Sequence, residues 1–156
     1  MGEIANVLVG VAEVEINTEP VGYTADGVTM TIRSDFADIK VEELAGTIKR
    51  VLSDQRVEVT LNMAEGSLVN LAEAIPGSSL DAATLTIGGG ALQEVQIKVI
   101  GTNPAGFNRT ITLTACNPTG EVGIPFKKGE ISVVPVTFSA LIDDDGIFGT
   151  LVDAAA

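Results

Sequence analysis

The side chains that could carry out chemistry are few in this sequence. The chain contains no histidine, which removes the usual general base and both the Ser-His-Asp and the Cys-His arrangements. Cys116 is the only cysteine. A thiol without a basic partner is a poor nucleophile, so we interpret Cys116 as a small buried hydrophobe. We predict no catalytic residues and no bound cofactor.

Two short motifs have some of the features of ligand sites. Asp143-Asp144-Asp145-Gly146 offers carboxylates that suit Ca²⁺, but it lacks the EF-hand spacing and the distal Glu, so an acidic β-turn is favoured. Gly88-Gly89-Gly90 is not followed by Lys-Ser/Thr or by a helix start, so a turn is favoured over a phosphate-binding loop. One Cys and no His cannot form a common zinc site. We therefore predict no metal site, and an enzyme relying on Asp143 and Asp145 is the least favoured alternative.

The composition limits the partners of the chain. Nine basic and 21 acidic residues give a net charge of −12, and phosphate-backbone binding needs clustered Lys and Arg. We expect neither stable nucleic-acid binding nor attachment to anionic lipid. The positive mean hydropathy of +0.37 requires either a large core or apolar surface that is buried between subunits. The 156 residues fit one domain, 1–156, without a signal peptide or a membrane span, made in a cytoplasm.

The stretch 46–75 organises the rest of the chain. Thr47–Ser53 is strand-like, Asp54-Gln55 is interpreted as a hairpin tip, and Arg56–Met63 alternates between apolar and polar residues. The period then changes to that of an amphipathic helix at about residues 67–75, with Ser67 as its N-cap and Pro76-Gly77 at its end. Its predicted apolar stripe consists of Leu68, Leu71, Ala72 and Ile75.

The remaining sequence predicts short strands separated by turns. Glu42–Gly46 is interpreted as a linker, Gly77–Ala83 as a loop and Asn117–Gly120 as a turn, and Pro135 indicates an edge or a bulge. The fold class is therefore mainly β, a β-sandwich or barrel with one short flanking helix. The other expected strands are Ile4–Ile16 with a bulge at Ala12-Glu13, Val28–Arg33, Phe36–Val41, Thr84–Ile87, Val95–Val99, Arg109–Cys116, Ile131–Ile142 and Ile147–Val152.

Three stretches, in this order, resemble the phage tail tube (major tail) protein family. The first is VLVGVAEVEI…PVGYTADGVTMTI from Val7, with its Gly22-x-Thr24-x-x-Gly27-Val28 turn. The second is LNMAEGSLVNLAEAI, and the third is PFKKGEISVVPVTFSALIDDDGIFGTLVD. In the second, the matching positions are Leu61, Glu65, Leu68, Leu71, Ala72 and Ile75. Together they cover nearly the whole chain and are similar to siphophage-type tube subunits and to related tail-like tubes.

The resemblance implies a structural protein of the virion tail. Such subunits form hexameric rings that stack into the tube through which DNA passes during genome delivery, without specific binding. The implied partners are further copies of the chain, the tape-measure and tail terminator proteins, and the baseplate or tip proteins; no membrane is involved. The resemblance implies a minimal subunit without an immunoglobulin-like domain, and it does not separate contractile from non-contractile tails.

The residues fit this expectation independently of the resemblance. The polar strand faces Thr29/Thr31/Arg33 and Arg56/Glu58/Thr60/Asn62 could line a wet channel, and an acidic wall would keep DNA from adhering. The candidate subunit-interface residues are Ser53, Asp54, Gln55 and Arg56. Substitutions at Asp54-Gln55 should spare folding and impair assembly. The alternative is a β-sandwich binding module, such as a capsid decoration or adhesion domain.

Overall fold

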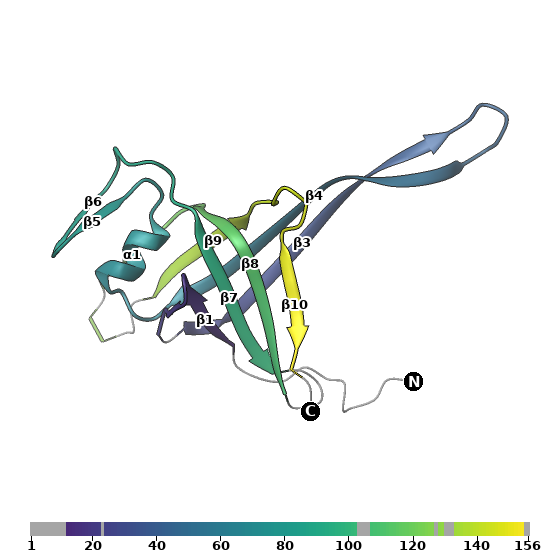
Figure 1. The fold of residues 1–156 in the computed structure, drawn as a ribbon. Helices are drawn as coiled ribbons and strands as arrows, with labels where there is room; N and C mark the ends of the chain where they lie inside the picture. Colours follow the sequence, from purple (N-terminus) through teal and green to yellow (C-terminus); the bar gives the residue numbers. More distant parts are fainter. Residues whose placement is uncertain (1–11, 23, 103–106, 127, 130–132, 155–156) are drawn as a thin grey trace.

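The computed structural model describes residues 12–22, 24–102, 107–126, 128–129 and 133–154, which form a mainly β fold with one short helix, as predicted (Figure 1). Most of the expected strand Ile4–Ile16 lies outside these residues, and so does its bulge. The elements are β1 (Glu13–Ile16), β2 (Glu19–Pro20), β3 (Thr24–Lys40), β4 (Thr47–Met63), α1 (Leu68–Ala74), β5 (Ser79–Asp81), β6 (Thr84–Thr86), β7 (Val95–Thr102), β8 (Asn108–Thr119), β9 (Val134–Ala140) and β10 (Gly149–Asp153).

One antiparallel sheet contains eight of these strands. Its order is β2-β1-β7-β8-β9-β4-β3, and β10 pairs with β8. The long strand β8 serves two partners in succession, because Arg109–Leu113 pairs with β10 and Cys116–Thr119 pairs with β9. The sheet folds over along β8, so that β7 and β8 cross in front of β9 and β4 (Figure 1). This arrangement encloses a single cluster of buried side chains.

The core follows the alternation that the sequence predicts for β4. Val57, Val59, Leu61 and Met63 are all at most 5% exposed. Val59 lies opposite Phe138 of β9, and both are fully buried. Burying one such side chain contributes about 1.5–3 kcal/mol. The other strands add Val14, Ile16, Val95, Ile97, Val99, Leu113, Cys116, Val134, Val136 and Ala140.

The helix α1 begins and ends where the sequence indicates. The backbone N–H of Asn70 donates to the Ser67 hydroxyl at 3.3 Å, which satisfies one N–H group of the first turn. At the other end Ile75 is the C-cap, and Gly77 has a φ of 72° that favours glycine. The capping prediction is therefore confirmed.

The face that α1 buries differs from the predicted stripe. The buried residues are Asn70, Leu71 and Ala74, whereas Leu68 is 37% exposed. The Asn70 amide donates to the backbone carbonyls of Val21 at 2.8 Å and Glu65 at 3.0 Å. A polar side chain can be buried here because both bonds are made inside the protein. The hydropathy pattern does not reveal that the Asn70 amide finds partners inside the protein. The apolar face predicted from that pattern therefore differs from the face that is buried.

The prediction of a hairpin tip at Asp54-Gln55 is wrong. β4 runs without interruption from Thr47 to Met63 and pairs with β3 from Thr24 to Lys40, so residues 41–46 form the turn between them. Because alternate residue pairs along both strands exchange backbone hydrogen bonds, cross-strand pairing outweighs the local turn preference of Ser53-Asp54. A register shift accommodates the polar stretch, with Ser53 as the extra residue. The expected strands Val28–Arg33 and Phe36–Val41 are one strand.

Three smaller predictions are also corrected or refined. The predicted loop Gly77–Ala83 contains β5, which pairs with β6. The predicted turn Asn117–Gly120 is mostly strand, because β8 continues to Thr119 and sets Pro118 opposite Phe138. Pro135 lies where β9 pairs with β4 but not with β8, so its missing N–H costs no hydrogen bond to β8. The predicted strands Val95–Val99 and Arg109–Cys116 are present as β7 and β8, which pair antiparallel.

Candidate assembly interface

The outward face of the β3–β4 ribbon is polar. The register sets Thr29 opposite Thr60 and Thr31 opposite Glu58, so these side chains share one face. The alternate positions, such as Val59, point into the core. The register therefore brings the two polar sets onto one face of the ribbon, and their role as the lining of a channel stays a prediction. This face has no protein layer to cover it within the described part of the chain, which suits a surface that contacts water.

Charged side chains continue this polar face toward the free end of the ribbon. Arg33 lies directly opposite Arg56. The next pair on the same face, two residues further along each strand, is Asp35 opposite Asp54. Like charges placed opposite each other across strands are destabilising. The Arg56 Nε lies 3.6 Å from an Asp54 carboxylate oxygen, so the neighbouring rows partly neutralise each other. Both side chains are more than half exposed, so this pair adds little stability.

Residues 31–56 form an arm that extends beyond the body of the protein (Figure 1). Every residue of the arm is exposed. An isolated two-stranded hairpin is at best marginally stable in water. Exposed contiguous apolar surface marks interaction sites. The large apolar side chains that the arm exposes are Ile32, Phe36, Ile39, Val41, Leu44, Ile48, Val51 and Leu52.

The four predicted interface residues lie on the β4 strand of this arm, close to the body. The Gln55 amide donates to the Ser34 hydroxyl at 3.4 Å, and its backbone N–H donates to the Asp54 carboxylate at 3.0 Å. Ser53 is the extra residue of the register shift. Ser53, Asp54, Gln55 and Arg56 are therefore neighbours on an exposed strand, away from the turn. Their role in assembly stays a prediction.

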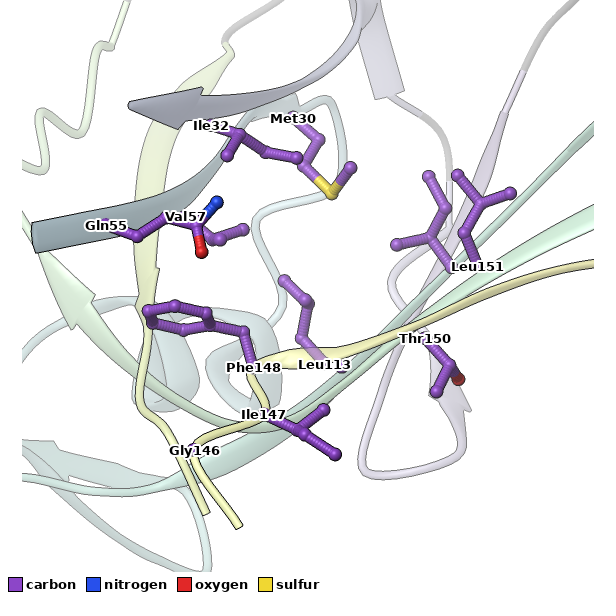
Figure 2. A pocket seen from close by; sticks show the side chains of 12 residues that line it. Met30, Ile32, Gln55, Val57, Leu113, Gly146, Ile147, Phe148, Thr150 and Leu151 are labelled. Atoms are coloured by element: carbon purple, nitrogen blue, oxygen red, sulfur yellow. The ribbon is translucent and has the colours of Figure 1, made fainter. Parts of the chain in front are cut away.

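An apolar groove opens where the arm joins the body. It has a volume of about 320 Å³ and runs between the base of β3 and β4 on one side and β8 and β10 on the other. Figure 2 shows Met30, Val57, Leu113 and Phe148 gathered around its centre. Gln55 and Thr150 are the polar side chains on its wall. An adjoining hollow shares Gln55, Gly146 and Phe148 with it and extends along the arm.

Unpaired strand edges flank this groove. Among the described strands, β10 pairs only with β8, and β3 pairs only with β4. The pairing of β4 with β9 ends at Glu58, so the rest of β4 has one free edge along the arm. Soluble proteins usually block such edges, because unpaired N–H and C=O groups invite another strand. The groove and the edges form a surface suited to binding a β-strand.

The side chains that could react or bind a metal have structural roles. Cys116 is fully buried, and burial raises the pKa of its thiol to about 12, so it is a poor nucleophile at neutral pH. The Asp143 carboxylate accepts from the backbone N–H groups of Asp145 and Ile147, each at 2.9 Å. The acidic turn expected there is confirmed. Within the described residues, no group of three or more acidic or Cys side chains could hold a metal ion.

Two of the sequence motifs meet in space near the helix. The Glu65 carboxylate, from the second family-like stretch, lies against the backbone of Gly22, from the first. Gly22 has a φ of 84°, a conformation that side chains disfavour. The glycine is thus needed for its backbone conformation and for the space that Glu65 occupies.

In the described part of the chain, no helix is long and apolar enough to cross a membrane.

The described part of the chain is thus a mainly β body with a projecting arm, an apolar groove and open sheet edges. The apolar arm residues are the functional candidates that sequence reasoning missed, because apolar residues in strand-like stretches are normally assigned to the core. The signal that could have found them is the combined length of the strand-like stretches on either side of Gly46, from Val28 to Met63, which predicts one hairpin too long for the body.

Comparisons with solved structures support this fold. The chain matches one described as the anti-feeding prophage cap, a tube-terminating cap, with a TM-score of 0.60 and 17% identity over 92% of this chain and 88% of that one. It also matches a chain of the sheath–tube complex of an extracellular contractile injection system, PVC, with a TM-score of 0.56 and 16% identity. That alignment covers 94% of this chain and 89% of the other.

A third match is a chain of the PVC sheath/tube terminator, with a TM-score of 0.55 and 15% identity over 93% of this chain and 94% of that one. No protein-family model and no curated protein sequence matches the chain. At identities this low, the structural likeness establishes a shared fold and nothing further. The chain therefore has the fold of components of phage-tail-like contractile injection systems, and the likeness does not single out the siphophage tube subunit.

Proposed function

We propose that this chain is a structural, non-enzymatic subunit that assembles into the hexameric rings of a tail-like tube. The observation that carries the proposal is the uncovered arm of residues 31–56, with eight large apolar side chains exposed. A monomer gains nothing from keeping this apolar surface in water. The fold supports the proposal, because its likeness to components of tube-forming particles extends over more than nine-tenths of the chain.

The energetics favour a ring over a single pair. The eight side chains are each about half exposed, and covering one contributes roughly 1 kcal/mol, or roughly 8 kcal/mol for the arm. The loss of translational and rotational freedom on association costs about 4–15 kcal/mol. One contact is therefore marginal. In a closed ring the last contact forms within one particle, where the effective concentration is high, so closure stabilises the assembly.

The polar face of β3 and β4 would line the lumen of such a ring. Its Thr29, Thr31, Glu58 and Thr60 side chains interact well with water and poorly with a phosphate backbone. The net charge of −12 adds a repulsive field for nucleic acid. The lumen would then let DNA or another acidic cargo pass without holding it. The tape-measure protein, the tail terminator and the baseplate or tip proteins are the expected partners, and the location is the tail of a virion or tail-like particle.

A terminating cap at the end of the tube is the second candidate. Two of the similar structures named above are described as a tube-terminating cap and a sheath/tube terminator. A tube subunit must bind further copies on both sides of the ring, whereas a cap binds on one side only. Stacking therefore distinguishes the two roles.

Negative-stain electron microscopy of the purified protein at rising concentration tests the proposal. A tube subunit should form stacked tubes with a central hole, and a cap should form single rings. Because a tube subunit can await an initiator, particles from the encoding organism should also be analysed by mass spectrometry. A chain that stays monomeric at every concentration and is missing from the particles would refute both roles.

A further inference from the structure

The apolar groove has the wrong chemistry for a small molecule. Its volume of about 320 Å³ lies at the lower end of the range for ligand pockets, about 300–1,000 Å³. Such pockets orient their ligand with several convergent polar groups. Here only Gln55 and Thr150 offer polar side chains on the wall. Apolar side chains carried by a β-strand suit it better, because free strand edges lie beside it.

The arm of the same molecule cannot fill the groove. The arm starts at the rim of the groove, since Ile32 and Gln55 belong to its wall. From Ile32 to Ile39 the strand advances seven residues, or about 24 Å, away from the body. Residues 39–50, here called the arm end, therefore lie far from their own groove (Figure 1). Each molecule carries one uncovered apolar ribbon and one open apolar groove on separate surfaces.

The charges favour the arm end of a second copy as the occupant. Residues 31–56 contain five basic and five acidic residues, which leaves four basic and sixteen acidic residues for the rest of the chain. The arm is neutral, whereas the body carries the whole net charge of −12. Contacts between two bodies are thus repulsive, and contacts between an arm and a body are not.

The net charges near the two surfaces are also opposite in sign. Asp143, Asp144 and Asp145 directly precede Gly146 and Ile147 on the wall of the groove. On the arm end, the three basic residues Lys40, Lys49 and Arg50 outnumber Glu42 and Glu43, and Lys49 follows Ile48, which is 51% exposed. Arg50 already pairs with Asp38. An arm end seated in the groove would bring opposite charges together around an apolar contact. The arm end also carries Leu44, the most exposed leucine of the arm at 62%.

We propose that the arm end of one copy docks in the groove of the next copy, with Leu44 and Ile48 against Phe148 and Leu151. The docking rests on the proposed assembly function and specifies which surfaces meet. Because the two surfaces differ, the contact is head-to-tail: it leaves a free arm at one end and a free groove at the other, and it closes into a ring only if the rotation permits.

Cysteine cross-linking tests the docking directly. Leu44→Cys protein is mixed with Leu151→Cys protein under mild oxidation, and a disulfide-linked dimer of one copy of each is expected. Cys116 does not interfere, because it is fully buried. The control replaces Leu44→Cys with Ile87→Cys, a residue that is 71% exposed and belongs to neither surface. Equal yields with the control, or no dimer, would overturn the docking.

A mixing experiment tests the head-to-tail geometry. Leu44→Asp removes the arm contact and Leu151→Asp removes the groove contact, so neither variant should associate alone. At high protein concentration, which a single marginal contact requires, their mixture should form dimers that stop at two copies, because one intact arm and one intact groove remain. Sedimentation velocity measures this outcome. Dimers of either variant alone would show that like surfaces meet and would refute the docking.

The two failures are distinguishable. If the wild-type protein forms rings or tubes while the Leu44→Cys and Leu151→Cys proteins do not cross-link, the docking is wrong and the proposed function stands. If they cross-link while rings and tubes never form and the chain is missing from particles, the docking stands and the tube role fails.

Discussion

Arg33 of β3 lies directly opposite Arg56 of β4 at the base of the arm. Two positive charges that face each other across a strand pair repel, so the arm keeps an unfavourable contact in the isolated subunit. Such a contact on the polar face is tolerable where a neighbouring copy supplies negative charge.

Replacing Arg33 with Glu should stabilise the isolated protein. The repulsive pair becomes an attractive one, and the expected gain is about 0.2–1 kcal/mol in the free energy of unfolding, measured by urea denaturation. Arg33→Gln is the control, since it removes the repulsion without adding an attraction, and its gain should be smaller. An Arg33→Glu protein less stable than Arg33→Gln would contradict the assigned cross-strand pairing.

The core should respond to truncation according to burial. Phe138→Ala should lower the free energy of unfolding by about 3–5 kcal/mol, and Leu61→Ala by about 2–5 kcal/mol, because both side chains are at most 1% exposed. Thr60→Ala, one position along β4 and exposed, is the matched control and should change stability by less than about 0.5 kcal/mol. Leu61→Asp should prevent folding. Equal effects at Leu61 and Thr60 would place the wrong face of β4 in the core.

The buried amide of Asn70 should matter more than its helical position suggests. Asn70→Leu keeps the number and branching of the side-chain heavy atoms but leaves the carbonyls of Val21 and Glu65 without their donor, so a loss of about 1–3 kcal/mol is expected in thermal or urea unfolding. Ser67→Ala, which removes the helix cap, should cost about 1 kcal/mol. If Asn70→Leu is as stable as the wild type, the hydrogen bonds from the Asn70 amide to Val21 and Glu65 do not stabilise the position of α1.

Stability should fall with rising pH because of Glu73. Burial, and then the neighbouring Glu19, raise the pKa of its carboxyl from 4.5 to about 7. The folded state therefore binds the proton more tightly than the unfolded state, and the contribution of Glu73 to stability is lost as the pH rises from 4.5 to about 7. Melting temperatures measured across this window should fall for the wild type relative to Glu73→Gln.

The other carboxylates are common to both proteins, so the difference between the two curves isolates Glu73. Glu19→Gln removes the second cause of the raised pKa of Glu73. The upper end of the pH range over which stability falls should therefore move to a lower pH. Parallel curves for the wild type and Glu73→Gln would show that this carboxyl has an ordinary pKa in the folded protein.

The exposed patch of Ser53, Asp54, Gln55 and Arg56 should affect assembly without affecting the fold. Gln55→Ala removes one weak hydrogen bond, to Ser34, so unfolding should be nearly unchanged. Because Gln55 is a polar residue on the wall of the groove, its removal should impair the self-association measured by sedimentation velocity. Asp81→Ala, on the separate β5–β6 hairpin, is a control. Unchanged association of Gln55→Ala would place the interface elsewhere.

The sequence predicts the parts of this fold that depend on local patterns. The alternation of Val57 to Met63 and the cap at Ser67 are visible because each is set by nearby residues. The pairing of β3 with β4 along 17 residues each is not visible, because it depends on contacts between residues up to 39 positions apart (Thr24 to Met63). Asp54-Gln55 therefore has the composition of a turn and lies in a strand.

The candidate site was predicted only in part, for the same physical reason. The polar face of the ribbon follows from parity, and its position in the structure agrees. The groove does not follow from the sequence, because it exists only once β10 pairs with β8 beside the base of the arm. The exposure of Leu44 and Ile48 depends on the arm leaving the body, which no local pattern encodes.

The most direct test of the assembly proposal is a cryo-electron microscopy reconstruction of the particle that the purified protein or its native tail forms. The proposal predicts rings of six copies with a central channel, with Thr29, Thr31, Glu58 and Thr60 facing that channel and the arm end of each copy against the next copy. A particle without a channel, or a ring in which this polar face points outward, would contradict it.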